Sequence, residues 1–256
     1  MEAKIRVDNI SKTFTLSKKQ MKINKTDEKR KVAVKDLSFK AYPGEIYGLL
    51  GPNGAGKTTT LRCISTLIKP DKGDIFVNNY SALKEANNVR KSIGFLTSDL
   101  KLEEFFTPNY MFDFFAKLHG LNPELTKKRK DEMFEKFGID SYKEVKISDL
   151  STGMRQKVQL VISIVHDPDI IIFDEPTNGL DIITGKIVTD FLIELKERGK
   201  TIIVSTHIFS LVEKICDRVG IIIDGKLIYD DLLDNVHKTH EHVENLFFDL
   251  VEVNAS

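Results

Sequence analysis

The architecture of this chain is best predicted from nine consecutive residues, Gly51-Pro52-Asn53-Gly54-Ala55-Gly56-Lys57-Thr58-Thr59. They match the pattern G-x-x-x-x-G-K-[ST], a glycine-rich loop between a strand and a helix whose backbone N–H groups surround the phosphates of a nucleotide. The start of the following helix adds the positive end of its dipole. We expect the Lys57 ammonium to reach the β- and γ-phosphates and the Thr58 hydroxyl to ligate Mg²⁺.

The segments that flank this loop have the periodicity that the pattern requires. The run Glu45–Leu50 predicts a buried strand before the loop, and a helix is expected from Lys57 to about Ile68, where Lys69-Pro70 ends it. The alternative interpretation is a structural turn, in which the glycines only allow a strand to pass tightly into a helix.

Strands and helices also alternate further along the chain. Apolar strands are predicted at Ile170–Phe173 and Thr201–Val204, with a helix from about Ile182 to Arg198 between them. Such alternation predicts a mostly parallel sheet covered by helices. The other predicted strands are Ile5–Phe14, Val32–Phe39 and the two halves of a hairpin, Val219–Ile223 and Lys226–Tyr229, which are joined by a type I′ turn at Asp224-Gly225.

Residues from about 97 to 165 interrupt this alternation and predict a helical insertion. Thr107-Pro108 and Asn122-Pro123 each place a capping side chain before a proline that suits the first position of a helix. A further helix is expected to begin at Ser151 and to end near His166.

Composition excludes several classes of protein. The chain has 256 residues, of which 41% are hydrophobic, and its 38 basic side chains balance 38 acidic ones. This balance argues against a disordered chain and against a globally basic nucleic-acid-binding protein, so no nucleic-acid partner is expected. The two cysteines, Cys63 and Cys216, have no metal-binding spacing and favour a reducing compartment. The sequence has no apolar signal segment and no run of about 20 apolar residues, which favours a cytoplasmic location.

Two acidic residues end the predicted strand Ile170–Phe173. Asp174 and Glu175 are expected at the carboxyl end of this strand, beside the glycine-rich loop, where carboxylates hold Mg²⁺ in nucleotide-hydrolysing sites. We predict that Asp174 ligates the metal together with Thr58, and that Glu175 polarises the attacking water as a general base. Taken alone, the pair would more often be solvated loop residues, since apolar strands commonly end in Asp or Glu.

A third motif lies at residues 150–156, Leu-Ser-Thr-Gly-Met-Arg-Gln. Together with the glycine-rich loop and Asp174-Glu175, it resembles the signature of the ATP-binding cassette (ABC) ATPases, which is usually Leu-Ser-Gly-Gly-Gln. Residues 178–181, Asn-Gly-Leu-Asp, and 205–207, Ser-Thr-His, stand where this family has its D-loop and its switch histidine. The order and spacing of these motifs resemble the family from about residue 4 to residue 230.

The resemblance implies both a fold and an activity. The fold would be an α/β P-loop NTPase (RecA-like) core with a mostly parallel sheet, an antiparallel β edge and an inserted α-helical subdomain. The activity would be ATP hydrolysis by a head-to-tail dimer, with ATP and Mg²⁺ as cofactors and each ATP held between the glycine-rich loop of one subunit and the signature of the other.

The resemblance also implies roles for particular residues. Lys57, Glu175 and His207 would be catalytic, and the nine residues at 51–59 would bind the nucleotide. Ser151 and Gly153 would contact the ATP that a second subunit holds. Phe14 stands where the family places an aromatic ring on adenine, although it could instead belong to the core.

Three residues depart from the family's pattern. Thr152 and Met154 replace the usual glycine and glutamine of the signature and add bulk to a turn that faces phosphate. Ser98 replaces the glutamine of the Q-loop. Because serine is too short to reach Mg²⁺ as that amide does, we expect no direct metal contact from Ser98.

Within the family, residues 48–60 resemble the ATPase subunits of ABC-2-type exporters, and residues 151–157 resemble NatA-type sodium-export ATPases. This resemblance implies a homodimeric subunit, peripheral on the inner face of the cell membrane, that powers an exporter of sodium ions through a separate permease. The alternative is a soluble ABC-type ATPase without a membrane partner. The permease is expected to dock near a group of phenylalanines after the Q-loop, although core packing is the alternative for each of them: Phe105, Phe106, Phe112, Phe114 and Phe115.

These patterns predict a nucleotide-binding domain at residues 4–236, with its helical subdomain at about 97–165. Residues 17–31 carry seven basic and two acidic side chains and predict a solvated basic loop. Asn24-Lys-Thr-Asp27 in this segment matches a guanine-reading pattern, but it lies upstream of the glycine-rich loop instead of downstream. Residues 237–256 form a C-terminal segment, and its three histidines are predicted to lie in a polar helix or linker, with metal binding as the less favoured alternative.

Overall fold

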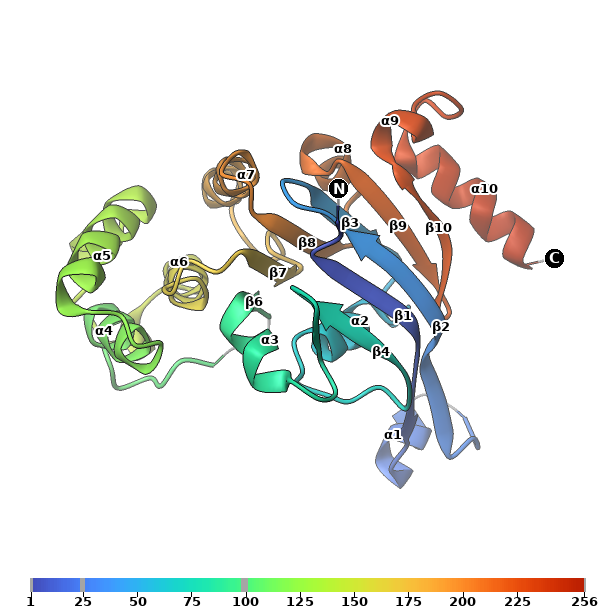
Figure 1. The fold of residues 1–256 in the computed structure, drawn as a ribbon, viewed down its shortest axis with the longest axis horizontal. Coiled ribbons are helices and arrows are strands. Elements are labelled where there is room, and N and C mark those ends of the chain that lie inside the picture. The colour runs from blue at the N-terminus through green and yellow to red at the C-terminus, as the bar shows by residue number, and fades with distance from the viewer. Residues whose placement is uncertain (1, 24–25, 98–100, 256) are drawn as a thin grey trace.

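The computed structural model describes residues 2–23, 26–97 and 101–255, in which the strands form two sheets (Figure 1). The first sheet has the order β2-β1-β4-β5, and all of its pairs are antiparallel. Its strands are β1 (Ile5–Thr15), β2 (Arg30–Ala41), β4 (Lys72–Val77) and β5 (Tyr80–Ser81).

The second sheet has the order β10-β9-β3-β8-β7-β6, and its pairs are parallel except for β10 with β9 at one edge. Every residue of β3, β7 and β8 is buried. Burial on both faces is typical of a parallel sheet and accounts for the nearly continuous apolar runs of these strands. The strands are β3 (Ile46–Leu50), β6 (Ile93–Leu96), β7 (Ile170–Asp174), β8 (Thr201–Thr206), β9 (Arg218–Ile223) and β10 (Lys226–Leu232).

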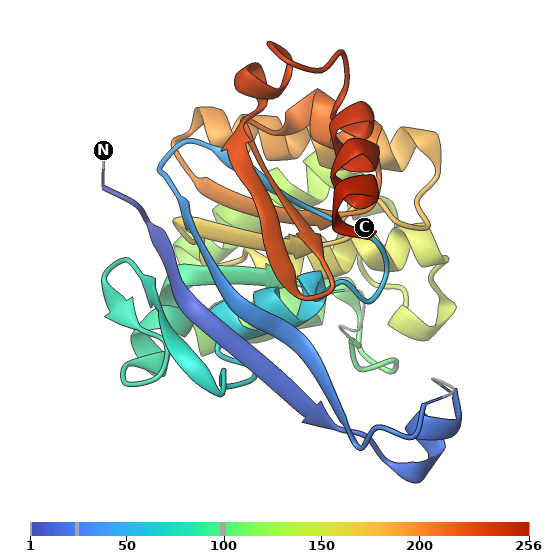
Figure 2. The same ribbon diagram turned by 90° about the vertical axis from the view of Figure 1, so that its right-hand side faces the viewer.

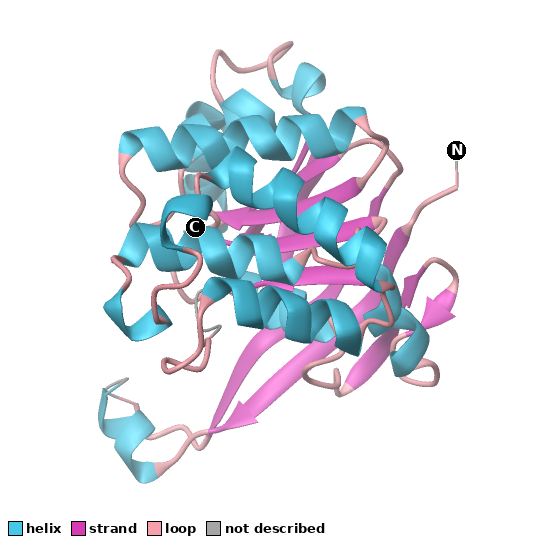
Figure 3. Cartoon of the chain, turned by 90° about the vertical axis from the view of Figure 1, so that its left-hand side faces the viewer, coloured by secondary structure: helices cyan, strands magenta, loops and turns pink. Residues whose placement is uncertain are grey.

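The helices lie mainly on one side of the parallel sheet, and the antiparallel sheet lies on the other (Figures 2 and 3). No helix among the described residues is long and apolar enough to cross a membrane. The helices are α1 (Lys18–Ile23), α2 (Lys57–Ile64), α3 (Ala86–Ser92), α4 (Pro108–Leu118), α5 (Pro123–Phe137), α6 (Thr152–Ser163), α7 (Ile182–Glu197), α8 (Phe209–Ile215), α9 (Leu233–Val236) and α10 (Val243–Ala255), with 3₁₀ turns η1 (Asp140–Tyr142) and η2 (Ile147–Asp149).

The alternation of side chains along β7 divides the core in two. Ile170 and Ile172 face the antiparallel sheet and α2, whereas Ile171 and Phe173 face the helices on the other side. Because successive side chains of a strand point to opposite faces, each strand of the parallel sheet contributes to both halves of the core.

The structure confirms the predicted α/β class, the mostly parallel sheet and the helical insertion, in which α4, α5 and α6 stand to one side of the sheet in Figure 1. The predicted caps are present. The Thr107 hydroxyl accepts a hydrogen bond from the Tyr110 backbone N–H, and the Asn122 side chain accepts one from Leu125. Asp224 and Gly225 have φ of +48° and +79°, as the predicted type I′ turn requires.

Residues 17–31 differ from the predicted loop. Helix α1 occupies part of this segment, and β2 begins at Arg30, so that β1 and β2 form a long arm with α1 at its end (Figures 2 and 3). The Leu16 backbone N–H donates to the Lys29 carbonyl and closes the arm. The prediction of a loop was wrong at α1 and at Arg30 and Lys31, because a strand pairs through its backbone while these two side chains remain in solvent. Residues 26–29 form no helix or strand, as predicted.

Two helices end earlier than predicted, and several short elements had no prediction. Helix α2 stops at Ile64 because Thr66 has a φ of +63° and the N–H groups of Leu67 and Ile68 return to the Arg62 carbonyl. Helix α6 stops at Ser163, before His166. Strand β6 and helices α3 and α8 are four to seven residues long, too short for a clear periodic signal.

The C-terminal segment contains α9 and α10. His237 lies 2.7 Å from a Glu213 carboxylate oxygen, and His240 lies 3.3 Å from Asp249. Among the residues that the structure describes, no group of three or more His, Cys, Asp and Glu side chains could hold a metal ion.

Candidate active site

The glycine-rich loop connects β3 to α2 and lies against two neighbouring strands. A Cβ atom on Gly51 would come within 2.3 Å of the Ile222 carbonyl oxygen on β9. Gly56 has a φ of +113°, and a Cβ atom there would come within 2.4 Å of the Ala33 carbonyl oxygen on β2. Both positions therefore exclude a larger residue, and the loop is held between β2 and β9.

Lys57 is the first residue of α2, and its side chain is buried beneath the loop. Its ammonium donates hydrogen bonds to the carbonyl oxygens of Gly51 (2.7 Å) and Pro52 (3.2 Å). It also lies 3.6 Å from a carboxylate oxygen of Glu175. Burial lowers the pKa of Lys57, and the nearby negative charge of Glu175 opposes this shift. The loop thus holds the Lys57 ammonium beside two carbonyl oxygens and one carboxylate oxygen.

Thr58 and Asp174 face each other across the same site, as predicted from the sequence. The Thr58 hydroxyl donates to Asp174 Oδ1 over 3.1 Å, and the Ser205 hydroxyl donates to the same oxygen. Asp174 is buried at the end of β7, and Ser205 is its partner in the pairing of β7 with β8. Hydroxyl and carboxylate oxygens are ligands that suit Mg²⁺, and this pair fits a metal that keeps several waters or phosphate oxygens.

Glu175 connects the lysine to the predicted switch histidine. Its Oε1 lies 3.6 Å from the Lys57 ammonium and 3.0 Å from His207 Nδ1, whereas its buried Oε2 has no hydrogen-bond partner among the described residues. Glu175 also has a φ of +54°, an unfavourable conformation for a residue other than glycine, and its N–H donates to the Ser205 carbonyl. Strained backbone of this kind is concentrated at functional sites.

Lys57, Thr58, Asp174 and Glu175 line one cleft of about 270 Å³. Six of the predicted site residues are not on its wall: Gly51, Pro52, Ala55, Ser151, Gly153 and His207. The first two hold Lys57, Ala55 is buried, and His207 contacts Glu175. The cleft is lined by Phe14, Lys31, Ala33, Asn53, Gly54, Gly56, Lys57, Thr58, Thr59, Asp174 and Glu175.

Phe14 lies at the edge of this cleft and not in the core. Its side chain is 38% exposed, which contradicts the alternative that placed it in the core. The Lys12 ammonium lies 5.7 Å from the centre of the ring. An exposed ring beside a phosphate-type loop can stack on a flat base.

Lys31 lines the cleft but was not identified in the sequence analysis. It lies directly opposite Phe14 in the pairing of β1 with β2. The sequence holds it within a basic run that offers no reason to single out one lysine. Only the strand register could have identified it.

Ser151 and Gly153 do not line this cleft. Ser151 is the N-cap of α6, and its hydroxyl accepts a hydrogen bond from the Met154 N–H over 3.3 Å. A Cβ atom on Gly153 would lie 3.8 Å from Asp181, the N-cap of α7. Within one chain, the signature is therefore beside the D-loop. It is separate from the cleft that Phe14, Lys57 and Asp174 line, which we call the nucleotide-type cleft.

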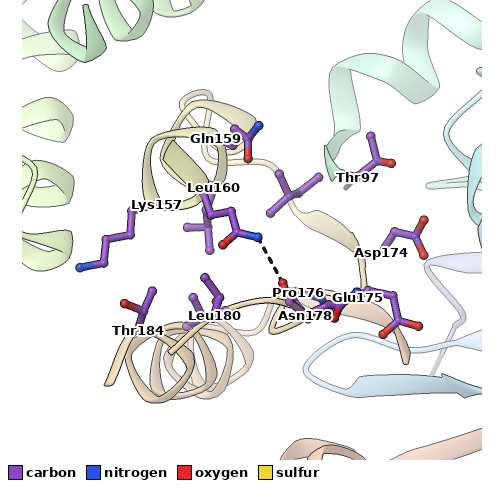
Figure 4. A pocket seen from close by; sticks show the side chains of 13 residues that line it. Thr97, Lys157, Gln159, Leu160, Asp174, Glu175, Pro176, Asn178, Leu180 and Thr184 are labelled. Carbon is purple, nitrogen blue, oxygen red and sulfur yellow. Dashed lines mark hydrogen bonds between the residues drawn. The ribbon is translucent and has the colours of Figure 1, made fainter. Parts of the chain in front are cut away.

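A second cleft lies between α6 and the segment that follows β7 (Figure 4). Asp174 and Glu175 are at one side of it and Lys157 is at the other. The Gln156 side chain donates to the Asn178 carbonyl over 3.2 Å, the dashed line in the figure. This contact links the signature helix to the segment that carries the two carboxylates. Thr97 also lines this cleft, whereas Ser98 lies outside the described residues.

Comparisons with known proteins agree with this geometry. The family model described as "ABC transporter" matches residues 34–178. The ABC transporter ATP-binding protein NatA of Bacillus subtilis is 40% identical over 222 residues, which cover 86% of this chain and 90% of NatA.

Two solved structures have a similar fold. One, an ATP-binding subunit of an ABC transporter, has a TM-score of 0.85 and 25% identity and covers 96% of this chain and 99% of its own. The other is a dimeric ATP-binding cassette in a post-hydrolysis state bound to ADP and Pi. It has a TM-score of 0.79 and 26% identity and covers 90% of this chain and 98% of its own.

Proposed function

Because this chain belongs to the ABC transporter family and is an ATP-binding ATPase of that family, we propose that it powers a membrane exporter through a separate permease subunit. The observation that carries the ATP-hydrolysing part of this proposal is the convergence of Lys57, Thr58, Asp174 and Glu175 on one cleft. The similarity to the ABC transporter ATP-binding protein NatA supports a role in transport. The resemblance of residues 151–157 to NatA-type sodium-export ATPases makes sodium ions the first cargo to test.

In the proposed reaction, the chain's own residues bind ATP and activate water. Lys57 neutralises the β- and γ-phosphates, and Phe14 stacks on the adenine. Glu175 takes a proton from the attacking water, and His207, 3.0 Å from Glu175, orients that carboxylate and contacts the γ-phosphate. Thr58 and Asp174 would hold Mg²⁺, which neutralises charge that develops on the phosphates.

We propose that a second copy of the chain completes the site. Ser151 and Gly153 lie outside the cleft of their own chain, in agreement with a role at the ATP of a partner. The N-terminus of α6 would add backbone N–H groups and a helix dipole to the phosphates. In this proposal, residues 4–236 form the nucleotide-binding domain, and the helical subdomain at about 97–165 carries the signature.

The permease would dock on aromatic side chains after the Q-loop. Phe105 is 63% exposed and lies next to Phe106, which stacks on Tyr110 at 4.2 Å. Tyr110 and Phe114 continue this patch and are each 48% exposed. Phe112, in contrast, is fully buried and belongs to the core. Exposed apolar patches of this kind mark interaction surfaces, and docking here would hold the chain at the inner face of the membrane.

The test is binding to permease-containing membranes. Phe105→Ser should reduce the protein that sediments with such membranes by about tenfold, while ATP binding in solution is unchanged. The matched control is Phe248→Ser on α10, because Phe248 is 52% exposed but lies outside the aromatic patch.

Equal sedimentation of both variants would contradict docking at Phe105. If the unmodified protein hydrolyses ATP but binds no membrane from its own cells, the alternative of an ABC-type ATPase without a membrane partner replaces the exporter proposal.

A further inference from the structure

Three lysines lie around the nucleotide-type cleft, and two of them already have partners. The Lys57 ammonium contacts two loop carbonyls and lies near Glu175. The Lys12 ammonium is 2.8 Å from Asp71. Lys31 makes no hydrogen bond or ion pair with its side chain within the part of the chain that the structure describes. Its charge is therefore available to a ligand in the cleft.

The position of Lys31 is fixed by strand pairing. Because Lys31 and Phe14 are directly opposite in β2 and β1, their side chains are on the same face of the sheet. From there the Lys31 side chain extends toward the loop. Its ammonium lies 4.0 Å from the point where a Cβ atom added to Gly54 would stand. It thus stands between the ring proposed to hold the base and the loop proposed to hold the phosphates.

We propose that Lys31 is a further nucleotide-binding residue whose ammonium contacts phosphate oxygens of ATP beside Gly54. A nucleotide stacked on Phe14, with its terminal phosphates at Lys57, must pass its phosphate chain through the space between these two residues. Lys31 lies on that path, and a flexible lysine can follow the chain as a mobile point charge. The inference rests on the proposed function, since it assumes that this cleft holds ATP.

The contact should be moderate in strength and sensitive to salt. Lys31 is exposed to solvent, so its interaction with phosphate is weaker than that of buried Lys57 and is screened by ions. We expect Lys31→Met, which keeps the length of the side chain and removes its charge, to raise the Kd for ATP about fivefold to tenfold at low salt. Lys31→Arg should restore most of the affinity.

The experiment is calorimetric titration of the full chain with Mg·ATP at low and at high salt. The matched control is Lys40→Met, because Lys40 lies on the same strand but lines a different pocket. The Kd of the Lys40→Met variant for ATP should equal that of the unmodified protein. Lys57→Ala is the positive control for loss of phosphate binding. The loss in Lys31→Met should shrink to under about threefold at about 0.5 M salt. Thermal melting without nucleotide establishes that each variant is folded.

Two results would overturn the inference. One is a Kd for Lys31→Met equal to that of Lys40→Met at low salt. The other is a loss in Lys31→Met that is equal at both salt concentrations and is not restored by arginine, because a structural defect does not depend on charge. If the unmodified protein and Lys57→Ala bind ATP equally poorly, the proposed function fails as well. If Lys57→Ala alone loses ATP, only the role of Lys31 is rejected.

Discussion

Replacing Glu175 by glutamine should separate ATP binding from hydrolysis. Glutamine has nearly the same shape, so the strained backbone at φ +54° and the contact with His207 are retained. The variant loses the negative charge that faces Lys57 at 3.6 Å and the base that would accept a proton from water. The two losses act on different steps of the reaction.

The effect on binding follows from the contact with Lys57. Two unit charges at this separation attract each other by about 5 kcal/mol at an effective dielectric constant of about 20, although desolvation of both groups offsets much of this. The carboxylate therefore competes with phosphate for Lys57 and repels the phosphates. Its removal should leave the Kd for ATP unchanged or lower it by up to about tenfold.

The effect on hydrolysis should be larger and opposite in sign. Loss of a positioned general base reduces rates by about 10²–10⁴-fold, which corresponds to an increase of about 3–5 kcal/mol in the activation barrier. Because ATP then persists between subunits, the variant should accumulate as a dimer at saturating ATP.

The assays are phosphate release, calorimetric titration with ATP and light scattering after size exclusion. Glu135→Gln is the control, since it removes an exposed carboxylate from α5, outside the cleft. A Glu175→Gln variant that keeps more than a tenth of the normal rate would refute the role assigned to Glu175. A variant that also remains a monomer at saturating ATP would contradict the proposal that a second copy completes the site.

Two further predictions concern the metal and the pH dependence of stability. Ser98→Ala should lower the steady-state ATPase rate by less than about tenfold, as expected for the loss of one neutral hydrogen bond. Asp174→Ala should lower the rate far more, because it removes the charged group that would hold Mg²⁺ beside Thr58. If rates measured against Mg²⁺ concentration show similar, thousandfold losses in both variants, Ser98 acts directly in catalysis. Burial, with His119 nearby, lowers the pKa of His166 to about 4. Because the ordinary pKa of histidine is about 6.5, the unfolded chain binds more protons than the folded chain as the pH falls from about 6.5 toward 4. The free energy of unfolding should therefore decrease over this range. Urea unfolding at pH 7 and pH 5 should show a smaller pH-dependent loss in His166→Asn than in the unmodified chain, and equal losses would contradict this assignment.

Contacts between residues that are close only in space could not be predicted from the sequence. Lys31 becomes part of the cleft because of its register opposite Phe14. Four of the five phenylalanines after the Q-loop share one chain of ring contacts with Tyr110, whereas Phe112 is buried and outside that chain. Local composition does not determine such relations. The basic run at 17–31 shows the same limit, since its charge suggested a loop and its backbone forms part of an arm.

From the sequence alone, the glycine-rich loop, the carboxylates after β7, the caps of α4 and α5 and the α/β class could be predicted. Each of these depends on residues that are close together in the chain, where dihedral preferences, capping and periodicity act directly. The tertiary structure alone determined that Glu175 lies between Lys57 and His207, that Ser205 supports Asp174, and that Ser151 is separate from the cleft of its own chain. These relations depend on how β3, β7 and β8 align in the sheet, because the parallel register brings residues more than a hundred positions apart to one edge.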